Sequence, residues 1–166
     1  ELVDGIVRSS TARNLVRVFF LQERLKAFGK DATFRARRVH VIGAGVMGGD
    51  IAAWCAQRGL TVTLQDQGIE RIAPAIKRAH ERIGRRIRDK LQLRAGMDRL
   101  IPDPEGAGAA RADVVIEAIF ENLEAKRKLF AHLEDVAQPH ALLASNTSSL
   151  KLADIGAHLT HPARLV

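Results

Sequence analysis

The sequence predicts an α/β domain with a doubly wound, mostly parallel sheet, preceded by one separate helix. Two observations point to this fold class. Short apolar runs of strand character alternate with helical segments, and a glycine-rich turn joins the first run to the first of those helices. Such alternation is typical of parallel strands covered by helices on both faces.

The first expected element is an amphipathic helix over residues 11–28 (TARNLVRVFFLQERLKAF). One of residues 9–11 is expected to cap it, Gly29 to end it, and residues 30–38 to form a linker to the next element. Its apolar positions at helical spacing are Leu15, Val18, Phe19, Leu25 and Phe28. A helix of this kind needs another surface to cover its apolar face.

Strand and helix signals then alternate up to Asp66. Val39–Ile42 is a short apolar run and Thr61–Gln65 is rich in β-branched residues, so each is expected to form a strand. Met47–Gln57 is expected to be the helix between them, ended by Gly59.

A long basic segment from Gly68 to about Leu100 is expected to be helical. Pro74 is expected in a helix's first turn, and Gly84 and Gly96 are expected weak points within the segment. Residues 102–108 are expected to form a loop.

The last part of the chain repeats the alternation. Asp113–Ile119 (DVVIEAI) is expected to be a buried strand, Leu123–Val136 a helix and Ala141–Ala144 another strand. The carboxyl ends of the strands in a doubly wound sheet open onto one crevice, so residues 119–121 and 145–148 are expected to face it beside the glycine-rich turn.

The composition is that of a globular protein with room for one well-buried domain. The chain has 166 residues, 46% of them hydrophobic and 27% charged, and no stretch approaches the roughly 18 unbroken apolar residues of a membrane span. No signal peptide is visible, and the start at Glu1 rather than Met suggests a piece of a longer protein. The single cysteine, Cys55, cannot form an internal disulfide and fits a buried packing role in a reducing compartment.

The net charge of +7 raises the question of an acidic partner. Ten Lys or Arg residues fall between Arg71 and Arg99. Such a segment suits nucleic acid, a membrane surface or a polyanionic small molecule, but interspersed acids equally suit a solvated helix. No aromatic residues alternate with these charges, so binding of nucleic acid is not favoured.

Three glycines, Gly43, Gly45 and Gly48, follow the first expected strand with GxGxxG spacing. In a dinucleotide site the first permits a tight turn, the second lets backbone amides approach a diphosphate, and the third lets helix pack closely on strand. The diphosphate then lies at a helix N-terminus, where unpaired N–H groups and the helix dipole favour negative charge. The motif therefore predicts a Rossmann fold, with a glycine-rich turn that binds no ligand as the alternative.

Asp66 ends the second expected strand, 18 residues past Gly48. A carboxylate at this place accepts hydrogen bonds from the adenosine ribose hydroxyls and repels a 2′-phosphate. Gln67 follows where an NADP enzyme often carries arginine, so NAD is the favoured cofactor.

Polar side chains gather at the ends of the last two strands. The Ser148 hydroxyl and the Asn146 amide each offer a donor and an acceptor to a substrate oxygen or to the nicotinamide ribose. The sequence Asn-Thr-Ser-Ser before Leu150 is equally a good helix cap. Glu121 and Lys126, taken alone, are an ordinary solvated acid and base near a helix start.

From Arg37 to its end the chain resembles the NAD-binding domain of L-3-hydroxyacyl-CoA dehydrogenases. The shared motifs are VIGAGVMGGDIA, the strand-end Asp66, VIEAIFENLEAK and ASNTSSL. The segment SSTARNLVRVFFLQERLKAFGK resembles the linker helix of the multifunctional fatty-acid oxidation α-subunit, where it follows an enoyl-CoA hydratase domain. The resemblance implies a linker helix in residues 1–36, an NAD-binding Rossmann domain in residues 37–166, and a cytoplasmic bacterial enzyme of β-oxidation.

The resemblance also implies roles for individual residues. Ser148 is implied to touch both NAD and the substrate's 3-oxygen, with Asn146 supporting it, which makes these two the implied catalytic residues. The basic helix corresponds to the family's arm over which coenzyme A lies, and Arg82 sits about where that arm meets the ligand. The implied cofactor-binding residues are Gly43, Gly45, Val46, Met47, Gly48, Asp66, Ile119, Phe120, Glu121, Lys126 and Ser148.

The family's catalytic histidine lies in a downstream HFFNP motif and its glutamate partner lies further on, whereas this sequence stops at ARLV. The family's C-terminal helical domain, which completes the acyl pocket and commonly mediates dimerisation, is expected to be missing as well. We therefore expect weak NAD binding, little turnover of acyl-CoA and some self-association from this chain alone, and a thiolase subunit is an implied partner of the parent complex. His158 and His161 have HxxH spacing but no accompanying carboxylate, so no metal site is expected.

Besides a basic nucleic-acid-binding protein, which is the least favoured, two rival functions stay open. One is an NAD-sensing module without catalysis. The other is a different NAD enzyme of the same fold, such as a 6-phosphogluconate or 3-hydroxyisobutyrate dehydrogenase, although those lack the pairing of ENxxxK with SNTSS found here.

Overall fold

The computed structural model describes residue 5, residues 9–27 and residues 33–166. The chain divides into two units, Glu1–Arg35 and Ala36–Val166, and each is described by itself. None of the described helices is both long enough and apolar enough to cross a membrane.

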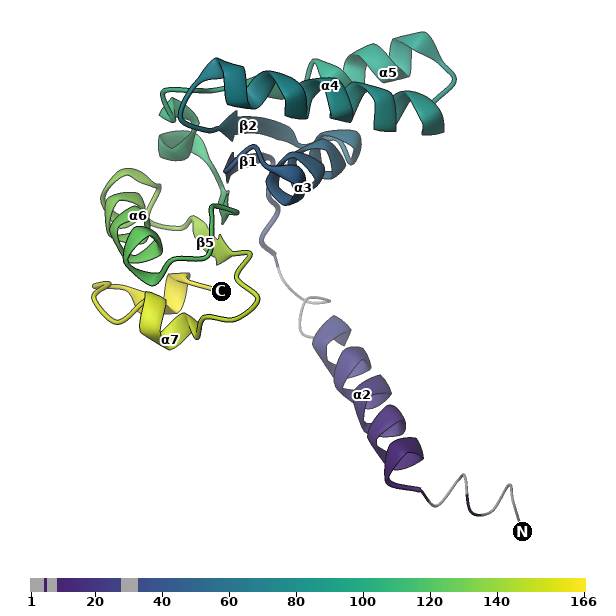
Figure 1. Cartoon of the computed structure of the whole chain (residues 1–166), viewed down its shortest axis with the longest axis vertical. Helices are drawn as coiled ribbons and strands as arrows, with labels where there is room; N and C mark the ends of the chain where they lie inside the picture. The colour runs from purple at the N-terminus through teal and green to yellow at the C-terminus, as the bar shows by residue number, and fades with distance from the viewer. Residues whose placement is uncertain (1–4, 6–8, 28–32) are drawn as a thin grey trace. The chain divides into compact units, whose positions relative to one another are not determined.

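The described helix of the first unit is α2 (Ser10–Ala27), drawn in purple in Figure 1. The Ser9 hydroxyl accepts a hydrogen bond from the Ala12 N–H at 3.1 Å, so Ser9 provides the expected cap. No residue of α2 is buried, and its apolar side chains, such as Leu15 and Leu25, are exposed. Gly29, the predicted end of the helix, lies outside the described residues.

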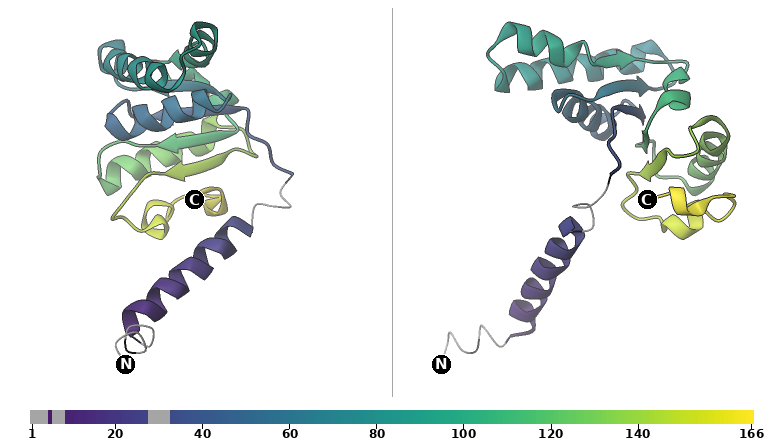
Figure 2. Two further views of the ribbon diagram at one scale, coloured as in Figure 1. Left: turned by 90° about the vertical axis from the view of Figure 1, so that its right-hand side faces the viewer. Right: turned by 180° about the vertical axis from the view of Figure 1, so that it is seen from behind.

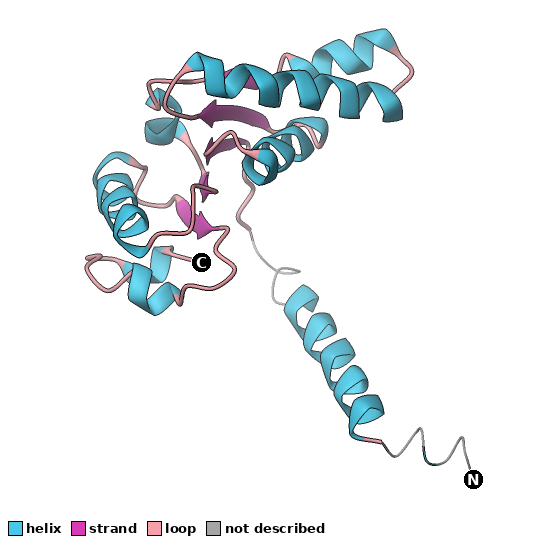
Figure 3. Cartoon of the chain, viewed as in Figure 1, coloured by secondary structure: helices cyan, strands magenta, loops and turns pink. Residues whose placement is uncertain are grey.

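The second unit contains one sheet of five parallel strands in the order β3-β2-β1-β4-β5, which confirms the doubly wound fold (Figures 1 and 3). The chain lays down β1, β2 and β3 in one direction and then returns to place β4 and β5 on the other side of β1. The carboxyl ends of β1 and β4 therefore flank the point where the direction reverses, which is where such sheets bind ligands. The strands are β1 (Arg38–Ile42), β2 (Thr61–Gln65), β3 (Leu100–Pro102), β4 (Val114–Glu117) and β5 (Leu142–Ser145).

Helices cover both faces of this sheet. Three of them, α3 (Val46–Gln57), α4 (Ile69–Arg86) and α5 (Lys90–Met97), lie on one side of the strands, as the right-hand view of Figure 2 shows in blue and teal. The 3-10 turn η1 (Ala107–Arg111) and the helices α6 (Leu123–Val136) and α7 (Leu152–Ile155) lie on the other. A further 3-10 turn, η2 (Pro162–Arg164), leads to an isolated parallel bridge between Leu165 and Leu143 beyond β5.

The two helical layers make two apolar cores because strand side chains alternate between the faces. The core under α3 and α4 contains Val41, Leu64, Ala52, Ala75 and Ile72. The core under α6 and α7 contains Val115, Leu143, Phe130, Leu133 and Ile155. Small residues dominate the first core and let α3 and α4 lie close to the strands and to each other.

The basic segment differs from its prediction. Helix α4 begins at Ile69, directly after the β2 turn, so Pro74 stands in its second turn rather than its first and leaves one helical carbonyl without its N–H partner. Gly84 and Gly96 both remain inside helices, and the break falls between them at residues 87–89. Asp89 sets this break because its carboxylate caps α5, accepting from the backbone N–H groups of residues 91 and 92.

Two strand predictions also need correction. Leu100 opens the short edge strand β3 instead of ending a helix, and β3 takes in Pro102 from the expected loop. Strand β4 ends at Glu117, not at Ile119, because the Glu117 carboxylate turns back to accept the Ile119 N–H at 2.8 Å. That bond lies at the point where the candidate site begins.

Candidate functional site

Loops at the carboxyl edge of the sheet are held in register by backbone hydrogen bonds that continue the strand ladders. The Gly43 N–H donates to the Gln65 carbonyl at 2.8 Å, and the Ala118 N–H donates to the Ile42 carbonyl at 2.7 Å. Beyond β4, the Asn146 N–H donates to the Glu117 carbonyl at 2.8 Å. The loops that follow β1, β4 and β5 therefore start from fixed positions around one crevice.

The glycine-rich turn uses each of its three glycines as the motif requires. Gly43 has a φ of +104°, and a Cβ there would collide with the Ala118 carbonyl of the neighbouring loop. A Cβ at Gly48 would collide with the carbonyl of Gly43, so this glycine brings helix and turn together. Around Gly45, in contrast, a Cβ would meet nothing within 4 Å, which leaves the backbone open to a ligand.

Helix α3 begins at this turn with unpaired donors. Gly45 is the N-cap and offers no side-chain hydrogen bond, and the first intrahelical bond runs from the Gly49 N–H to the Gly45 carbonyl at 3.0 Å. The N–H groups of Val46 and Met47 precede that bond, and both residues are largely exposed. A helix start of this kind binds anions because its free N–H groups and its dipole both favour negative charge.

Asp66 lies against the same turn. Its Oδ2 accepts a hydrogen bond from the Ala44 N–H at 2.7 Å, and its Oδ1 accepts one from the Gln67 N–H at 2.8 Å. Each carboxylate oxygen has a further lone pair available, so the group is fixed in place while still able to accept hydrogen bonds from a ligand.

A cavity of about 430 Å³ opens between Asp66 and the loop after β4. It joins the turn after β1, the end of β2 and the exposed Phe120, and it is the size of a pocket for a small molecule or part of a cofactor. Its lining residues are Ile42, Gly43, Gly45, Gln65, Asp66, Gln67, Arg71, Pro104, Ala118, Ile119 and Phe120.

A buried ion pair supports the far side of the crevice. Lys126 on α6 donates through Nζ to Glu117 Oε1 at 2.6 Å, and both side chains are fully buried. The other Glu117 oxygen accepts from the Ser145 hydroxyl at 2.6 Å. Lys126 also lies 3.3 Å from Glu121, so it joins the end of β4 to the loop that follows. Lys126 is thus not solvated, in contrast to the simplest interpretation of the sequence.

Glu121 organises the loop after β5. One of its oxygens accepts hydrogen bonds from the Thr147 hydroxyl, the Ser148 N–H at 3.2 Å, and both the N–H and the hydroxyl of Ser149 at 3.1 and 2.9 Å. These donors, the Thr147 hydroxyl foremost, lower the pKa of Glu121 to about 2. The carboxylate is therefore charged at neutral pH and holds the loop at the carboxyl edge.

Ser148 and Asn146 keep their side chains exposed on this loop. Within the described part of the chain, no hydrogen bond engages the Ser148 hydroxyl, so it is available to a ligand. The alternative that these residues cap a helix is wrong, because α7 begins only at Leu152 and its N-cap, Lys151, makes no side-chain capping bond. The Thr147 hydroxyl instead accepts from the Leu150 N–H at 3.1 Å and closes a local turn.

Arg82 lies on α4, on the face of the sheet that α3 covers. It forms an ion pair with Asp50 of α3, and both side chains are nearly half exposed. The same surface carries Arg78, Glu81 and Arg85 around a shallow pocket of about 340 Å³. The basic helix thus presents several arginines beside α3.

A buried histidine lies under the β2 side of the crevice. The Nδ1 atom of His40 lies 2.8 Å from the Thr63 hydroxyl oxygen, and its Nε2 atom lies 2.9 Å from the Gln65 amide oxygen. The amide oxygen is an acceptor, so Nε2 carries the proton and Nδ1 accepts from the hydroxyl. Burial lowers the pKa of His40, which keeps this ring neutral.

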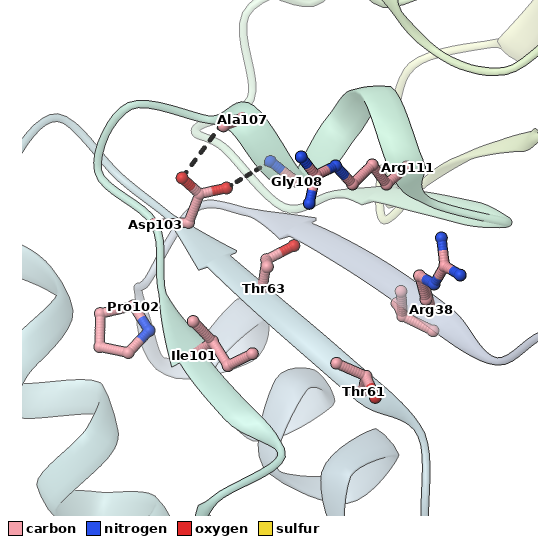
Figure 4. A pocket seen from close by; sticks show the side chains of 10 residues that line it. Arg38, Thr61, Thr63, Ile101, Pro102, Asp103, Ala107, Gly108 and Arg111 are labelled. Carbon is pink, nitrogen blue, oxygen red and sulfur yellow. Dashed lines mark hydrogen bonds between the residues drawn. The ribbon is translucent and has the colours of Figure 1, made fainter.

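A second cavity, of about 510 Å³, lies on the face of β2 that η1 only partly covers (Figure 4). Asp103 shapes its upper edge by accepting the N–H groups of Ala107 and Gly108 at 3.1 and 2.7 Å, as the dashed lines show. Two threonines, Thr61 and Thr63, and two arginines, Arg38 and Arg111, complete the polar part of its lining. Because the β3-to-β4 crossover contains only a 3-10 turn, no long helix fills this space.

Two of the remaining histidines lie away from the crevice. His161 follows α7, and its N–H donates to Glu134 near the end of α6, while His140 precedes β5 at the opposite edge of the sheet. Across residues 9–27 and 33–166, no three His, Cys, Asp or Glu side chains gather as metal ligands would.

Several residues around the crevice were not predicted from the sequence, among them Glu117, Arg71 and Pro104. Glu117 is an acid inside an apolar strand, nine residues before Lys126, and that placement was the available signal for a buried pair. Arg71 and Pro104 line the cavity from α4 and from the loop after β3, but no sequence pattern marks them because only the folded chain brings these segments together.

The chain was compared with protein families and with known proteins, and both comparisons found matches. Residues 38–166 match the family model described as "3-hydroxyacyl-CoA dehydrogenase, NAD binding domain". The 3-hydroxyadipyl-CoA dehydrogenase of Escherichia coli K12 is 41% identical over 131 residues, which are 76% of this chain and 28% of that protein.

Two solved structures share the fold. The structure of a 3-hydroxybutyryl-CoA dehydrogenase from Escherichia coli K12 matches with a TM-score of 0.76 at 38% identity, over 80% of this chain and 29% of that one. The dehydrogenase part of multifunctional enzyme 1 from Caenorhabditis elegans matches with a TM-score of 0.72 at 25% identity, over 80% and 31% of the two chains. This chain spans less than a third of the length of each of these proteins.

Proposed function

The chain belongs to the 3-hydroxyacyl-CoA dehydrogenase NAD-binding domain family, and we propose that it serves as the NAD-binding part of an enzyme that oxidises L-3-hydroxyacyl-CoA to 3-ketoacyl-CoA. The observation that carries the proposal is the cradle at the carboxyl edge of the sheet. There an open glycine turn, an uncapped helix start and a fixed carboxylate converge on one cavity.

Each part of the cradle suits one part of NAD. The N–H groups of Gly45, Val46 and Met47 would hold the diphosphate, with Gly43 and Gly48 shaping the turn. Asp66 would accept the hydroxyls of the adenosine ribose in the cavity. Ile119 and Phe120, which line the opposite wall, would lie along the cofactor.

The loop after β5 suits the nicotinamide half and the substrate. Ser148 would contact both cofactor and the substrate's 3-oxygen, and Asn146 would support it. Glu121 would hold this loop against the nicotinamide side. Lys126 is fully buried, so its part in cofactor binding would be to fix Glu121 rather than to touch NAD.

The reaction needs an acceptor of hydride, which NAD supplies when bound, and a group that removes the proton of the 3-hydroxyl. No histidine lines the cavity, and His40 is enclosed by Thr63 and Gln65, so no described histidine at this edge is placed as that base. Since no described histidine is placed as that base, we propose that this chain binds NAD but turns over little or nothing alone, because losing a general base costs on the order of 10²–10⁴ in rate.

The substrate and the setting are part of the same proposal. Arg82, on the basic helix, would contact coenzyme A, in exchange for part of its pairing with Asp50. The likeness of α2 to a linker helix and the match to the dehydrogenase part of a multifunctional enzyme support a cytoplasmic, multifunctional β-oxidation enzyme, with a thiolase subunit as partner. Exposed apolar side chains on α2 support self-association of this chain.

Titration with NADH tests the central assignment. Replacing Asp66 with alanine should weaken NADH binding roughly 10- to 100-fold, because hydrogen bonds to a charged acceptor are lost, and should not weaken NADPH binding. The control is Asp98→Ala, which removes an exposed carboxylate at the end of α5 without touching the cavity. Equal NADH affinity in the unmodified chain and in the Asp66 variant would overturn the assignment.

A further inference from the structure

One arginine of the basic helix reaches the glycine-rich turn from behind. Arg78 lies on α4, and its Nη2 donates to the Gly45 carbonyl at 3.1 Å and lies 3.4 Å from the Ala44 carbonyl. These two oxygens belong to the turn that leads into α3. The contact therefore joins α4 to the backbone of the glycine-rich turn.

Gly49 makes room for this contact. A Cβ at Gly49 would stand 3.0 Å from the Ala75 Cβ and 3.3 Å from Arg78 Nη2, so only a glycine lets α4 and the guanidinium come this close without adjustment. Gly49 lies outside the GxGxxG motif, and the motif does not explain it. The close approach of α4 to the turn does.

One donor of the Arg78 guanidinium has no partner among the described residues. The Arg78 Nε is buried, and no residue in the described part of the chain accepts its hydrogen bond. Burial of an unpaired donor is unfavourable, so the side chain is held by what Nη2 contacts rather than by a full set of partners. Its neighbours differ: Arg82 pairs with Asp50, and Lys77 is exposed.

The two carbonyls belong to peptide units whose N–H groups are part of the proposed diphosphate site. The Ala44 carbonyl shares its peptide unit with the Gly45 N–H, and the Gly45 carbonyl shares its unit with the Val46 N–H. A cation that donates to these oxygens draws electron density from the amides and makes their N–H groups stronger donors. Its positive charge also adds to the partial positive charge of the helix start.

We propose that Arg78 is a positioning residue for the dinucleotide: it locks the glycine-rich turn and strengthens the Gly45 and Val46 N–H groups as donors to the diphosphate. This inference rests on the proposed function, because it requires that a diphosphate binds at the turn. It assigns Arg78 a role that neither the glycine motif nor the strand-end acid contains.

The experiment compares Arg78→Met with Lys77→Met, which removes one positive charge from the adjacent, exposed position of the same helix. Binding of NADH, ADP and adenosine is measured for each. Arg78→Met should weaken NADH and ADP by the same factor, roughly tenfold, and should leave adenosine within about twofold of the unmodified chain. Lys77→Met should leave all three ligands within about twofold.

Amide NMR supplies a second measurement that needs no ligand. In Arg78→Met the amide proton resonances of Gly45 and Val46 should move upfield, because the polarising cation is gone, and in Lys77→Met they should stay. Arg78→Lys keeps the charge but loses the guanidinium donor, and it should give intermediate shifts and affinities. It serves as the test variant if Arg78→Met does not fold.

Unchanged ADP affinity in the Arg78 variants, or an equal loss of adenosine binding, would overturn the proposal. Unshifted Gly45 and Val46 resonances would also overturn it. If the unmodified chain bound neither NADH nor ADP, the proposed function would fail, while the amide resonances would still report whether Arg78 polarises the turn.

Discussion

Replacing Lys126 with methionine should destabilise the second unit by about 3–5 kcal/mol, the usual cost of leaving one buried charge without its partner. Lys126 and Glu117 are both fully buried, with 2.6 Å between Nζ and Oε1. Without the lysine, the Glu117 carboxylate keeps only two neutral donors, the Ile119 N–H and the Ser145 hydroxyl. For a domain of this size each kcal/mol lowers the melting temperature by about 3–4 °C.

The pair is best measured as a double-mutant cycle with Glu117→Gln. The double variant buries no unpaired charge, so it should lose much less stability than the two single variants added together, with a coupling energy of about 2–4 kcal/mol. Urea unfolding followed by circular dichroism gives each free energy of unfolding. Lys128→Met, an exposed lysine on the same helix, is the control and should change stability by less than about 0.5 kcal/mol.

Two outcomes would refute this reasoning. The first is a Lys126→Met cost within about 1 kcal/mol of the Lys128→Met control. The second is additivity, in which the double variant loses the sum of the single losses. If Lys126→Met does not fold at all, the double variant should still fold, and its failure would count equally against the account.

Further predictions concern two other charged groups. The Glu121 carboxyl should titrate near pH 2, so the stability that its contacts with residues 147–149 contribute should be complete above about pH 4.5 and be lost as the pH falls toward 2. Glu121→Gln should speed hydrogen exchange of the Ser148 and Ser149 amides, and a carbon-13 titration midpoint above pH 4 for the Glu121 carboxyl would contradict the assignment. Because burial lowers the pKa of His40, the unfolded chain takes up a proton on this ring at a higher pH than the folded chain does. The free energy of unfolding should therefore fall as the pH drops below about 6.5, by up to about 1.4 kcal/mol per pH unit. Urea unfolding at pH 7.5 and 5.5 should show that His40→Gln loses less of its free energy of unfolding between these two pH values than the unmodified chain does. Identical losses in the two proteins would refute the assignment.

Local pattern was enough to predict the elements around the glycine turn. Strand β2 and helix α6 match their expected bounds, Thr61–Gln65 and Leu123–Val136, because alternation and helical period are strong there and turn residues flank both. Asp66 and the three glycines of the motif could be placed at one edge for the same reason. The positions of these residues depend on the local backbone of the turn, and the spacing of the glycines in the sequence is enough to predict that backbone.

Elements that depend on distant contacts could not be predicted. Strand β3 is only three residues long and ends in Pro102, so only pairing with β2 reveals it. Arg78 is one of ten basic residues in its segment, and nothing local separates it from Lys77. Its role depends on how closely α4 approaches α3, which Gly49 and Ala75 decide together.

A crystal structure of this chain with NAD bound would show where the dinucleotide lies. We expect the adenosine ribose hydroxyls within hydrogen-bond distance of the Asp66 carboxylate and the diphosphate against the Gly45 and Val46 N–H groups. Density for the dinucleotide elsewhere, for example in the cavity beside Arg38 and Arg111, with the glycine-rich turn empty, would contradict this expectation.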